Sequence, residues 1–351
     1  MARILGLISF LVLSLLVNGC SPVYVLRVGW GQARLIRARI PIEKVLEEGS
    51  LLPEEEAKIR LILEVKSYAR EKLGLKPSSN YTDFVQVKEK GVSYALSACP
   101  QDSLEPYQWW FPIVGNIPYL GFFSKETAMK EKKRLNVQGY DTYLREVVAY
   151  STLGWFRDPI FSSMLSYNEV QLADLIFHEL FHGTVFVKDR MDFNESLATF
   201  VGQQGAITFF CNGEGEKSLQ CRSARTLAHD DFHFSRFIEG LYERLHVLYN
   251  GPFSRPEKLA RREEIFRRAL EEFQVVRENL STDSYSFLNP EFLNNAFLMT
   301  LRTYHNHIPL YQRVHERLGG DLRKTIDLFR QAARSETDPL AWLASWLGKE
   351  E

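Results

Sequence analysis

Apolar residues recur with two different periods along the chain. From about residue 166 onward the spacing is helical, and Asn-Gly, Asn-Pro and Gly-Gly steps separate the helical runs. Before that point, helical runs at 42–73 and 124–136 are joined by segments at 81–97 and 142–150 that alternate as strands do. The pattern predicts an α+β fold that is mostly helical and carries a small mixed or antiparallel sheet.

Two stretches fit neither period. Residues 24–42 are mixed and punctuated by Gly29 and Gly31, so they are predicted to be extended or irregular. Residues 104–123 combine prolines and glycines with clustered aromatic side chains. We interpret this second stretch as an apolar plug between the sheet and the helices. The alternative is that it lines a substrate cleft.

The first nineteen residues have the pattern of an export signal. Arg3 is their one charge, and the apolar run from Ile4 to Val17 is too short for a comfortable membrane-spanning helix. The Val-Asn-Gly-Cys sequence ending at Cys20 resembles a bacterial lipobox, which predicts cleavage before Cys20 and acylation of that cysteine. Ser21 then implies sorting to the outer membrane, with the folded part in the periplasm. Ordinary signal cleavage without a lipid is the alternative.

Length and charge narrow the classes of protein further. About 330 residues follow the signal, enough for a single domain at 20–351 with a sheet-containing part at about 24–165 and a helical part at about 166–351. The formal charge of −1 and the absence of a long basic run exclude nucleic acid as an expected partner. Membrane contact is expected through the lipid anchor on Cys20.

The strongest chemical pattern lies in a helical run. His178, Glu179 and His182 form H-E-x-x-H. Positions i and i+4 share one face of a helix, so both imidazoles can bind a single metal ion. Glu179 stands beside that face, where a carboxylate can take a proton from a water at the metal. An amphipathic core helix with two hydrogen-bonded histidines is the alternative.

Glu195 is the predicted third metal ligand. The chain turns after Gly183, and a second helix is predicted to begin near Asp192 or Asn194, either of which suits an N-cap. Glu195 would then face back toward the histidines from the first turn. Two histidines and one glutamate leave the fourth position of a zinc ion open for water, as in catalytic zinc sites. Stabilisation of the helix dipole is the alternative role for Glu195.

Residues outside these helices complete the predicted site. Peptide hydrolysis needs a donor aimed at the developing oxyanion, and Tyr304 or His305 can supply it; a packed or capping aromatic pair is the alternative. Residues 147–151, at the end of the strand predicted near 142–150, are the expected edge strand for pairing with an extended substrate backbone. Its substrate-binding residues are predicted to be Val147, Ala149, Tyr150 and Ser151.

Two further groups of side chains carry weaker patterns. Cys211 and Cys221 bracket a polar loop, which an oxidising periplasm would allow a disulfide to close. Cys99 is left over and is expected to be a buried thiol. His229 and His233 also have i, i+4 spacing, but nothing nearby completes a second metal site, so they are interpreted as a helix start or surface.

Several segments together resemble a bacterial family of zinc-dependent aminopeptidases, which are exported lipoproteins. The resemblance covers nearly all of the chain after the signal. It implies a branch of the gluzincins, metallopeptidases with a zincin-like fold whose third ligand is a glutamate on a following helix, and hence one Zn²⁺ per chain. The matching segments are 31–32, 110–115, 118–121, 149–159, the H-E-x-x-H, 193–196, 294–296, 304–305 and 319–322.

The sequence therefore predicts a zinc metallopeptidase that acts on peptides in the periplasm, and the resemblance adds aminopeptidase activity. The chain lacks G-x-M-E-N, the motif with which well-known zinc aminopeptidases bind a free α-amino group. Two alternatives remain open at this stage. One is an envelope lipoprotein that binds peptides or protein partners without turnover, and the other is a zinc amidase that acts on cell-wall material.

Overall fold

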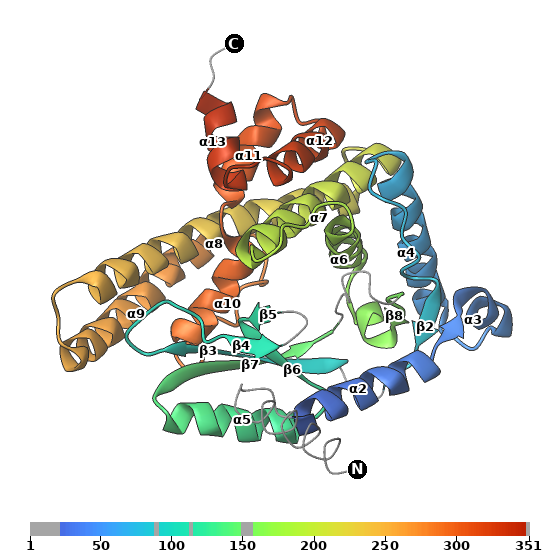
Figure 1. Cartoon of the computed structure of the whole chain (residues 1–351). Coiled ribbons are helices and arrows are strands. Elements are labelled where there is room, and N and C mark those ends of the chain that lie inside the picture. The colour runs from blue at the N-terminus through green and yellow to red at the C-terminus, as the bar shows by residue number, and fades with distance from the viewer. Residues whose placement is uncertain (1–21, 88–90, 112–114, 149–156, 349–351) are drawn as a thin grey trace, which may run out of the picture.

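The computed structural model describes residues 22–87, 91–111, 115–148 and 157–348. Over these residues the fold is α+β and mostly helical with small sheets, as the sequence predicts (Figure 1). The helices are α2 (Pro22–Arg37), α3 (Ile42–Glu48), α4 (Pro53–Glu71), α5 (Lys125–Val137), α6 (Glu169–His182), α7 (Met191–Gly213), α8 (Leu219–Asn250), α9 (Arg255–Glu278), α10 (Asn295–His305), α11 (Ile308–Arg317), α12 (Leu322–Ala333) and α13 (Pro339–Gly348). The strands are β1 (Ile40–Pro41), β2 (Asp83–Val85), β3 (Ser93–Pro100), β4 (Trp109–Phe111), β5 (Gly115–Ile117), β6 (Tyr119–Phe122), β7 (Tyr140–Val147) and β8 (Ile160–Phe161).

The main sheet has the strand order β6-β3-β7, and both pairs are antiparallel. Figure 1 shows α5 along one side of this sheet and α10 crossing the other. Leu96 of β3 belongs to one apolar cluster with Leu135 of α5. On the other side, the rings of Tyr143 (β7) and Phe297 (α10) meet edge-on with their centres 4.8 Å apart. Within the described residues, β7 is left at the edge of the sheet.

Helices α6 and α7 form a closely packed hairpin that carries the predicted metal ligands. Helix α6 begins where the side chain of Asn168 accepts a hydrogen bond from the backbone N–H of Gln171 (2.9 Å). Two glycines of α7 allow the close approach. A Cβ on Gly205 would stand 2.7 Å from Cγ of Phe177, and a Cβ on Gly202 would overlap the carboxyl group of Asp174.

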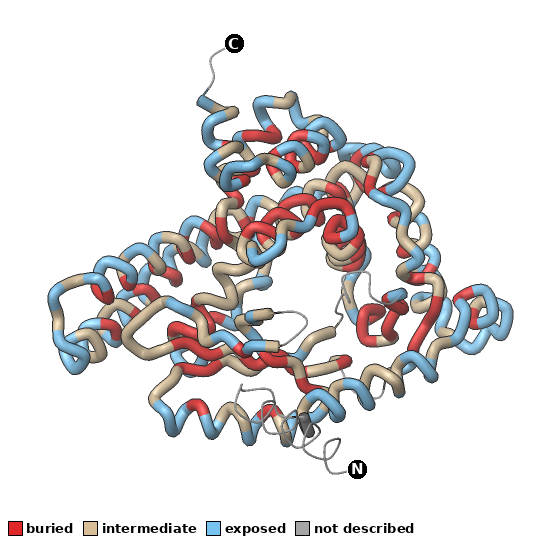
Figure 2. The backbone as a smooth tube through the Cα atoms, viewed as in Figure 1, coloured by how far each residue is buried: buried red, intermediate tan, exposed pale blue. Residues whose placement is uncertain are grey.

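The largest apolar core is built on this hairpin. Helix α4 packs on one side of it, and the C-terminal helices α11 to α13 cover another side (Figure 1). Figure 2 shows buried positions concentrated along α6 and α7 and in the strands. A second apolar core joins α8, α9 and α10. The hairpin is therefore held from several directions, as a site with fixed geometry requires.

A buried ion pair fixes α10 against the sheet. Arg262 of α9 lies 2.9 Å from a carboxylate oxygen of Asp141 in β7, and both side chains are more than nine-tenths buried. Asp141 also accepts the backbone N–H of Asn295 at the start of α10 (3.0 Å). The side chain of Asn294 caps the same helix by accepting the N–H of Phe297 (2.9 Å). These bonds set the position of Tyr304, which lies near the other end of α10.

The prediction that residues 24–42 are extended or irregular is wrong, because most of them form helix α2. The glycines in that stretch do not break the helix. Gly31 faces the ring of Phe123, which leaves no space for a Cβ. The hydroxyl of Tyr24 donates to the carbonyl of Gly121 (2.8 Å). Helix α2 is thus held by β6 and by Phe123, the residue that follows it, about a hundred positions away in the sequence.

The aromatic stretch at 104–123, for which the sequence indicates neither helix nor strand, contains the short strands β4, β5 and β6 in its described part. Trp109, Leu120 and Phe122 are buried in the apolar cluster shared with α5, which agrees with the plug interpretation. Trp110 and Tyr119 are exposed. The stretch therefore has one face in the core and another at the surface.

Candidate metal centre

The structure brings together the three predicted metal ligands. His178 and His182 lie one turn apart near the end of α6, and Glu195 lies in the second turn of α7. The three side chains converge from the two arms of the hairpin. Their convergence follows from local chain geometry, because eight residues connect the two helices.

The start of α7 differs from the prediction. The helix begins at Met191, with Arg190 in the N-cap position, so Asp192 and Asn194 do not cap it. Asn194 instead binds the connecting loop. Its Oδ1 accepts the N–H of Val187 (2.8 Å), and its Nδ2 donates to the carbonyl of the same residue (2.7 Å). Asn194 therefore holds the loop next to the ligand-bearing turn, which favours a fixed position for Glu195.

The three donor atoms form a nearly regular triangle. The Nε2 atoms of His178 and His182 are 3.2 Å apart, and Oε2 of Glu195 lies 3.3 Å from the first and 3.5 Å from the second. A tetrahedral zinc ion with ligands at about 2.0–2.1 Å holds its ligand atoms about 3.3–3.4 Å apart. The donor set and its spacing therefore fit a zinc ion with one position open.

Among the described residues, no other group of three His, Cys, Asp or Glu side chains converges in this way. His229 and His233 bring their Nε2 atoms to 3.1 Å in the body of α8, without a third ligand. Because they lie inside a long helix, the structure agrees with the prediction that they are surface residues and disagrees with the prediction that they start a helix.

Glu179 lies next to the candidate ligands, and one oxygen of its carboxylate makes no hydrogen bond within the described residues. That oxygen, Oε2, is buried. Burial raises the pKa of Glu179, while the two neighbouring histidines lower it to a smaller extent. A buried carboxylate without a partner is unfavourable unless a ligand or water occupies the adjacent space. This is the arrangement expected of a general base.

The surroundings of Glu195 lower its pKa, whereas those of Glu179 raise the pKa of that residue. Burial alone would raise its pKa, but the adjacent His182 and His178 outweigh burial, and the pKa of Glu195 lies below its ordinary value. The carboxylate is therefore held ionised next to the histidines. An ionised carboxylate beside two imidazole nitrogens is a suitable donor set for a divalent cation.

Tyr304 of α10 lies close to this centre. Its ring is 6.3 Å from the ring of His178, and its hydroxyl accepts a hydrogen bond from Nη2 of Arg145 in β7 (2.9 Å). No sequence pattern indicates a role for Arg145. It is one basic residue in a strand-like segment, belongs to no motif, and meets Tyr304 only through the tertiary fold.

His305, the other candidate oxyanion donor, is directed toward α8. Its Nδ1 lies 2.7 Å from a carboxylate oxygen of Asp231, and its ring packs edge-on against Phe234 with the centres 5.1 Å apart. Asp231 also accepts the hydroxyl of Tyr285 (2.6 Å). Consecutive helix positions point about 100° apart. The geometry therefore favours Tyr304 over His305 for contact with a substrate at the centre.

The predicted substrate strand is described in part. Val147 is the last residue of β7 and pairs with Ser93 of β3. Ala149, Tyr150 and Ser151 lie outside the described residues, as does the predicted lipidation site Cys20. The role of this strand in substrate binding stays a prediction.

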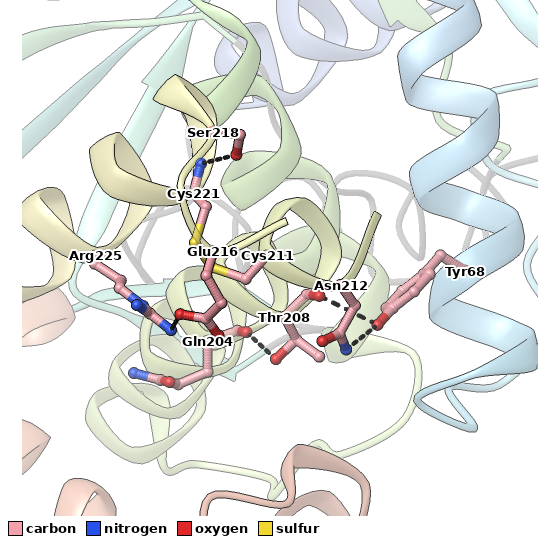
Figure 3. The surroundings of a disulfide bond; sticks show 9 residues. All are labelled: Tyr68, Gln204, Thr208, Cys211, Asn212, Glu216, Ser218, Cys221 and Arg225. Atoms are coloured by element: carbon pink, nitrogen blue, oxygen red, sulfur yellow. Dashed lines mark hydrogen bonds and ion pairs between the residues drawn. A yellow bond between two sulfur atoms is a disulfide. The ribbon is translucent and has the colours of Figure 1, made fainter. Parts of the chain in front are cut away.

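Cys211 and Cys221 are joined by a disulfide bond in the structure (Figure 3). The bond links the last turns of α7 to the first turn of α8. Close by, the hydroxyl of Tyr68 in α4 donates to the carbonyl of Thr208 in α7 (3.4 Å). The end of α7 far from the candidate ligands is thus tied to two neighbouring helices. Cys99 is buried and unpaired, as predicted.

The fold and the site together define a mostly helical α+β protein with a candidate centre for a divalent metal on a helical hairpin. A family model described as "Putative aminopeptidase" (Aminopep) matches residues 23–339. The chain belongs to this family. Searches of curated proteins and of solved structures give no significant match.

Proposed function

We propose that this protein is a zinc-dependent peptidase with the aminopeptidase activity that its family description suggests. The observation that carries the proposal is the triangle of His178, His182 and Glu195, whose edges suit a tetrahedral zinc ion. The family match supports peptide hydrolysis as the reaction. The unpartnered carboxylate of Glu179 beside the triangle supports a catalytic role over a purely structural one.

Each residue has a defined role in this proposal. When bound, zinc supplies a Lewis acid that lowers the pKa of a water molecule and polarises the scissile carbonyl. Glu179 accepts a proton from the attacking water and transfers it to the leaving amine. Tyr304 donates its O–H toward the oxygen on which negative charge develops. The apolar residues around α6 keep bulk water away from these charges.

The proposal includes export and acylation at Cys20, which place the enzyme at the outer membrane with its folded part in the periplasm. This part rests on the sequence of residues 1–21. Within the described residues, no helix combines the length and apolar character needed to cross a bilayer.

The test combines metal analysis with a peptide digest. The purified chain is expected to bind about one zinc and to cleave members of a peptide library, with the new ends identified by mass spectrometry. Glu179→Gln should keep the metal and the fold and lose cleavage. Glu169→Gln, an exposed substitution in the first turn of the same helix, is the matched control and should stay active.

Four outcomes would contradict the proposal. Cleavage that survives Glu179→Gln would exclude the assigned base. Bound zinc without cleavage of any peptide would favour a binding lipoprotein or an amidase acting on cell-wall material. Failure to bind zinc, or stoichiometric zinc in His178→Ala, would exclude the assigned ligands.

A further inference from the structure

Arg145 places a positive charge beside the candidate metal centre. Its guanidinium carbon lies 5.4 Å from the centre of the Tyr304 ring, which in turn lies 6.3 Å from the ring of His178. Together these two distances put the guanidinium within about 12 Å of His178. An extended peptide advances at most about 3.3–3.6 Å per residue. A group within three residues of the bond at the centre can therefore reach Arg145.

The charge of Arg145 has no counter-ion in the described part of the chain. Its one hydrogen bond there goes to the neutral hydroxyl of Tyr304, and the groups that raise its pKa are tyrosines, first of all Tyr304. A guanidinium has five N–H donors, so most of its hydrogen-bonding capacity is left over. By contrast, the buried guanidinium of Arg262 in α9 is paired with the carboxylate of Asp141 at 2.9 Å. A partly buried arginine without a carboxylate is unfavourable unless a ligand supplies the anion.

The side chain is also on the side of the sheet that faces the centre. Side chains alternate across a strand, so Arg145 shares a face of β7 with Tyr143 and Val147. Tyr143 contacts Phe297 of α10 on that face. The opposite face of β7 meets α5, where Thr142 donates to Asn136. Arg145 is therefore on the same side of the sheet as α10, Tyr304 and the metal ligands.

We propose that Arg145 forms a carboxylate-binding subsite next to the metal centre. It would select substrates with a carboxylate within three residues of the bond that is cleaved. That carboxylate is either the free C-terminus of a short peptide or the side chain of Asp or Glu. The planar guanidinium binds such a group through two parallel hydrogen bonds. This inference rests on the proposed peptidase function, because it assigns a substrate class to the same site.

The test uses peptides that differ only in charge. Trialanine is compared with trialanine amide, and Ala-Glu-Ala amide with Ala-Gln-Ala amide, using the zinc-loaded chain. A charge-assisted hydrogen bond predicts that one carboxylate peptide exceeds its neutral counterpart in kcat/KM by on the order of 10- to 100-fold. Arg145→Gln should bring the ratio close to one by slowing the charged peptide alone. Arg145→Lys should restore part of it.

Two comparisons separate this role from others. Tyr304→Phe should slow charged and neutral peptides alike, because it removes a donor that both use. Arg134→Gln, on the side of the sheet covered by α5, should leave the ratio unchanged. Each variant is checked for zinc content and unfolding temperature. If Arg145→Gln slows both members of a pair equally, or the unmodified protein does not distinguish them, the subsite does not exist.

An equilibrium measurement distinguishes failure of the subsite from failure of the peptidase proposal. Binding of the same peptides to zinc-loaded Glu179→Gln is measured by calorimetry, with and without Arg145→Gln. If this variant prefers the carboxylate peptides in binding and the unmodified zinc-loaded chain hydrolyses none of the peptides, the subsite is retained and the peptidase proposal is rejected. Hydrolysis without such a preference would reject the subsite and retain the peptidase. Which pair shows the preference identifies the C-terminal or the side-chain carboxylate.

Discussion

Replacement of Gly202 by alanine tests whether the close approach of α6 and α7 sets the geometry of the candidate metal centre. The new Cβ would overlap the carboxyl group of Asp174 and stand 2.8 Å from the carbonyl oxygen of the same residue. Ordinary contact begins at 3.4 Å, so the two helices must separate by about 0.6 Å at this point. The obstacle is backbone, which a side-chain rotation does not relieve.

The expected cost follows from two opposing effects. Overpacking of this kind costs about 1–3 kcal/mol, and alanine regains about 1 kcal/mol of helix propensity over glycine. A clash with backbone should cost about 3 kcal/mol, the upper end of the range for overpacking, so the free energy of unfolding should fall by a net of about 2 kcal/mol. Gly240→Ala in α8 is the matched control, because nothing lies within 4 Å of its added Cβ. That substitution should stabilise the protein by about 1 kcal/mol.

The same displacement should weaken metal binding. A working site is held within about 0.5 Å of its productive geometry, and disturbed support of metal ligands typically costs about 10- to 100-fold in metal affinity, so separation of the helices should lower zinc affinity at least about tenfold. The assay is thermal unfolding together with zinc titration against a competing chelator. If Gly202→Ala raises the unfolding temperature as Gly240→Ala does and keeps full zinc affinity, the helices do not constrain the site as described.

Three further substitutions test other parts of the structure. Burial, and then the charge of Asp231, raise the pKa of Asp174 to about 8. Its neutral form therefore stabilises the fold fully below about pH 4, and this contribution is lost as the pH rises through about 8. The measurement is the unfolding temperature of Asp174→Asn and of the unmodified protein, with chelator present. The two temperatures should coincide at pH 4, and the variant should become the more stable protein as the pH rises to 8. A difference between them that is constant with pH would contradict the raised pKa of Asp174. Replacing Cys211 and Cys221 by serine opens a loop with a sequence separation of 10 and should cost about 2–3 kcal/mol in chemical unfolding, whereas an unchanged midpoint would show that the bond adds nothing. Asp141→Ala leaves Arg262 buried without its partner and should cost about 3–5 kcal/mol in urea unfolding at pH 7; a loss below about 1 kcal/mol would refute the role of this ion pair.

The sequence could indicate the ligand set because its geometry is local. His178 and His182 need only one turn of helix to share a face, and a short connection brings Glu195 back to them. The sequence could not indicate Arg145. Its hydrogen bond to Tyr304 spans 159 positions and depends on how α10 crosses the sheet. A lone arginine in a strand carries no local signal of such a contact.

The two wrong predictions have a related physical cause. The prediction treats the glycines in α2 as helix breakers, whereas Gly31 is small because Phe123 occupies the space of its side chain. The prediction makes Asn194 a possible N-cap, whereas its side-chain amide binds the backbone of Val187 in the preceding loop. In both cases the sequence shows the residue type but not the group that the residue contacts. The partner is set by packing, which local propensity does not contain.

The hairpin also has a consequence for the order in which the molecule folds. All three candidate ligands lie between positions 178 and 195, so their triangle needs only the closure of one short loop. The contact of Arg145 with Tyr304 must wait until the sheet and α10 have assembled. During folding, the triangle of candidate ligands should therefore form before the proposed carboxylate-binding subsite at Arg145.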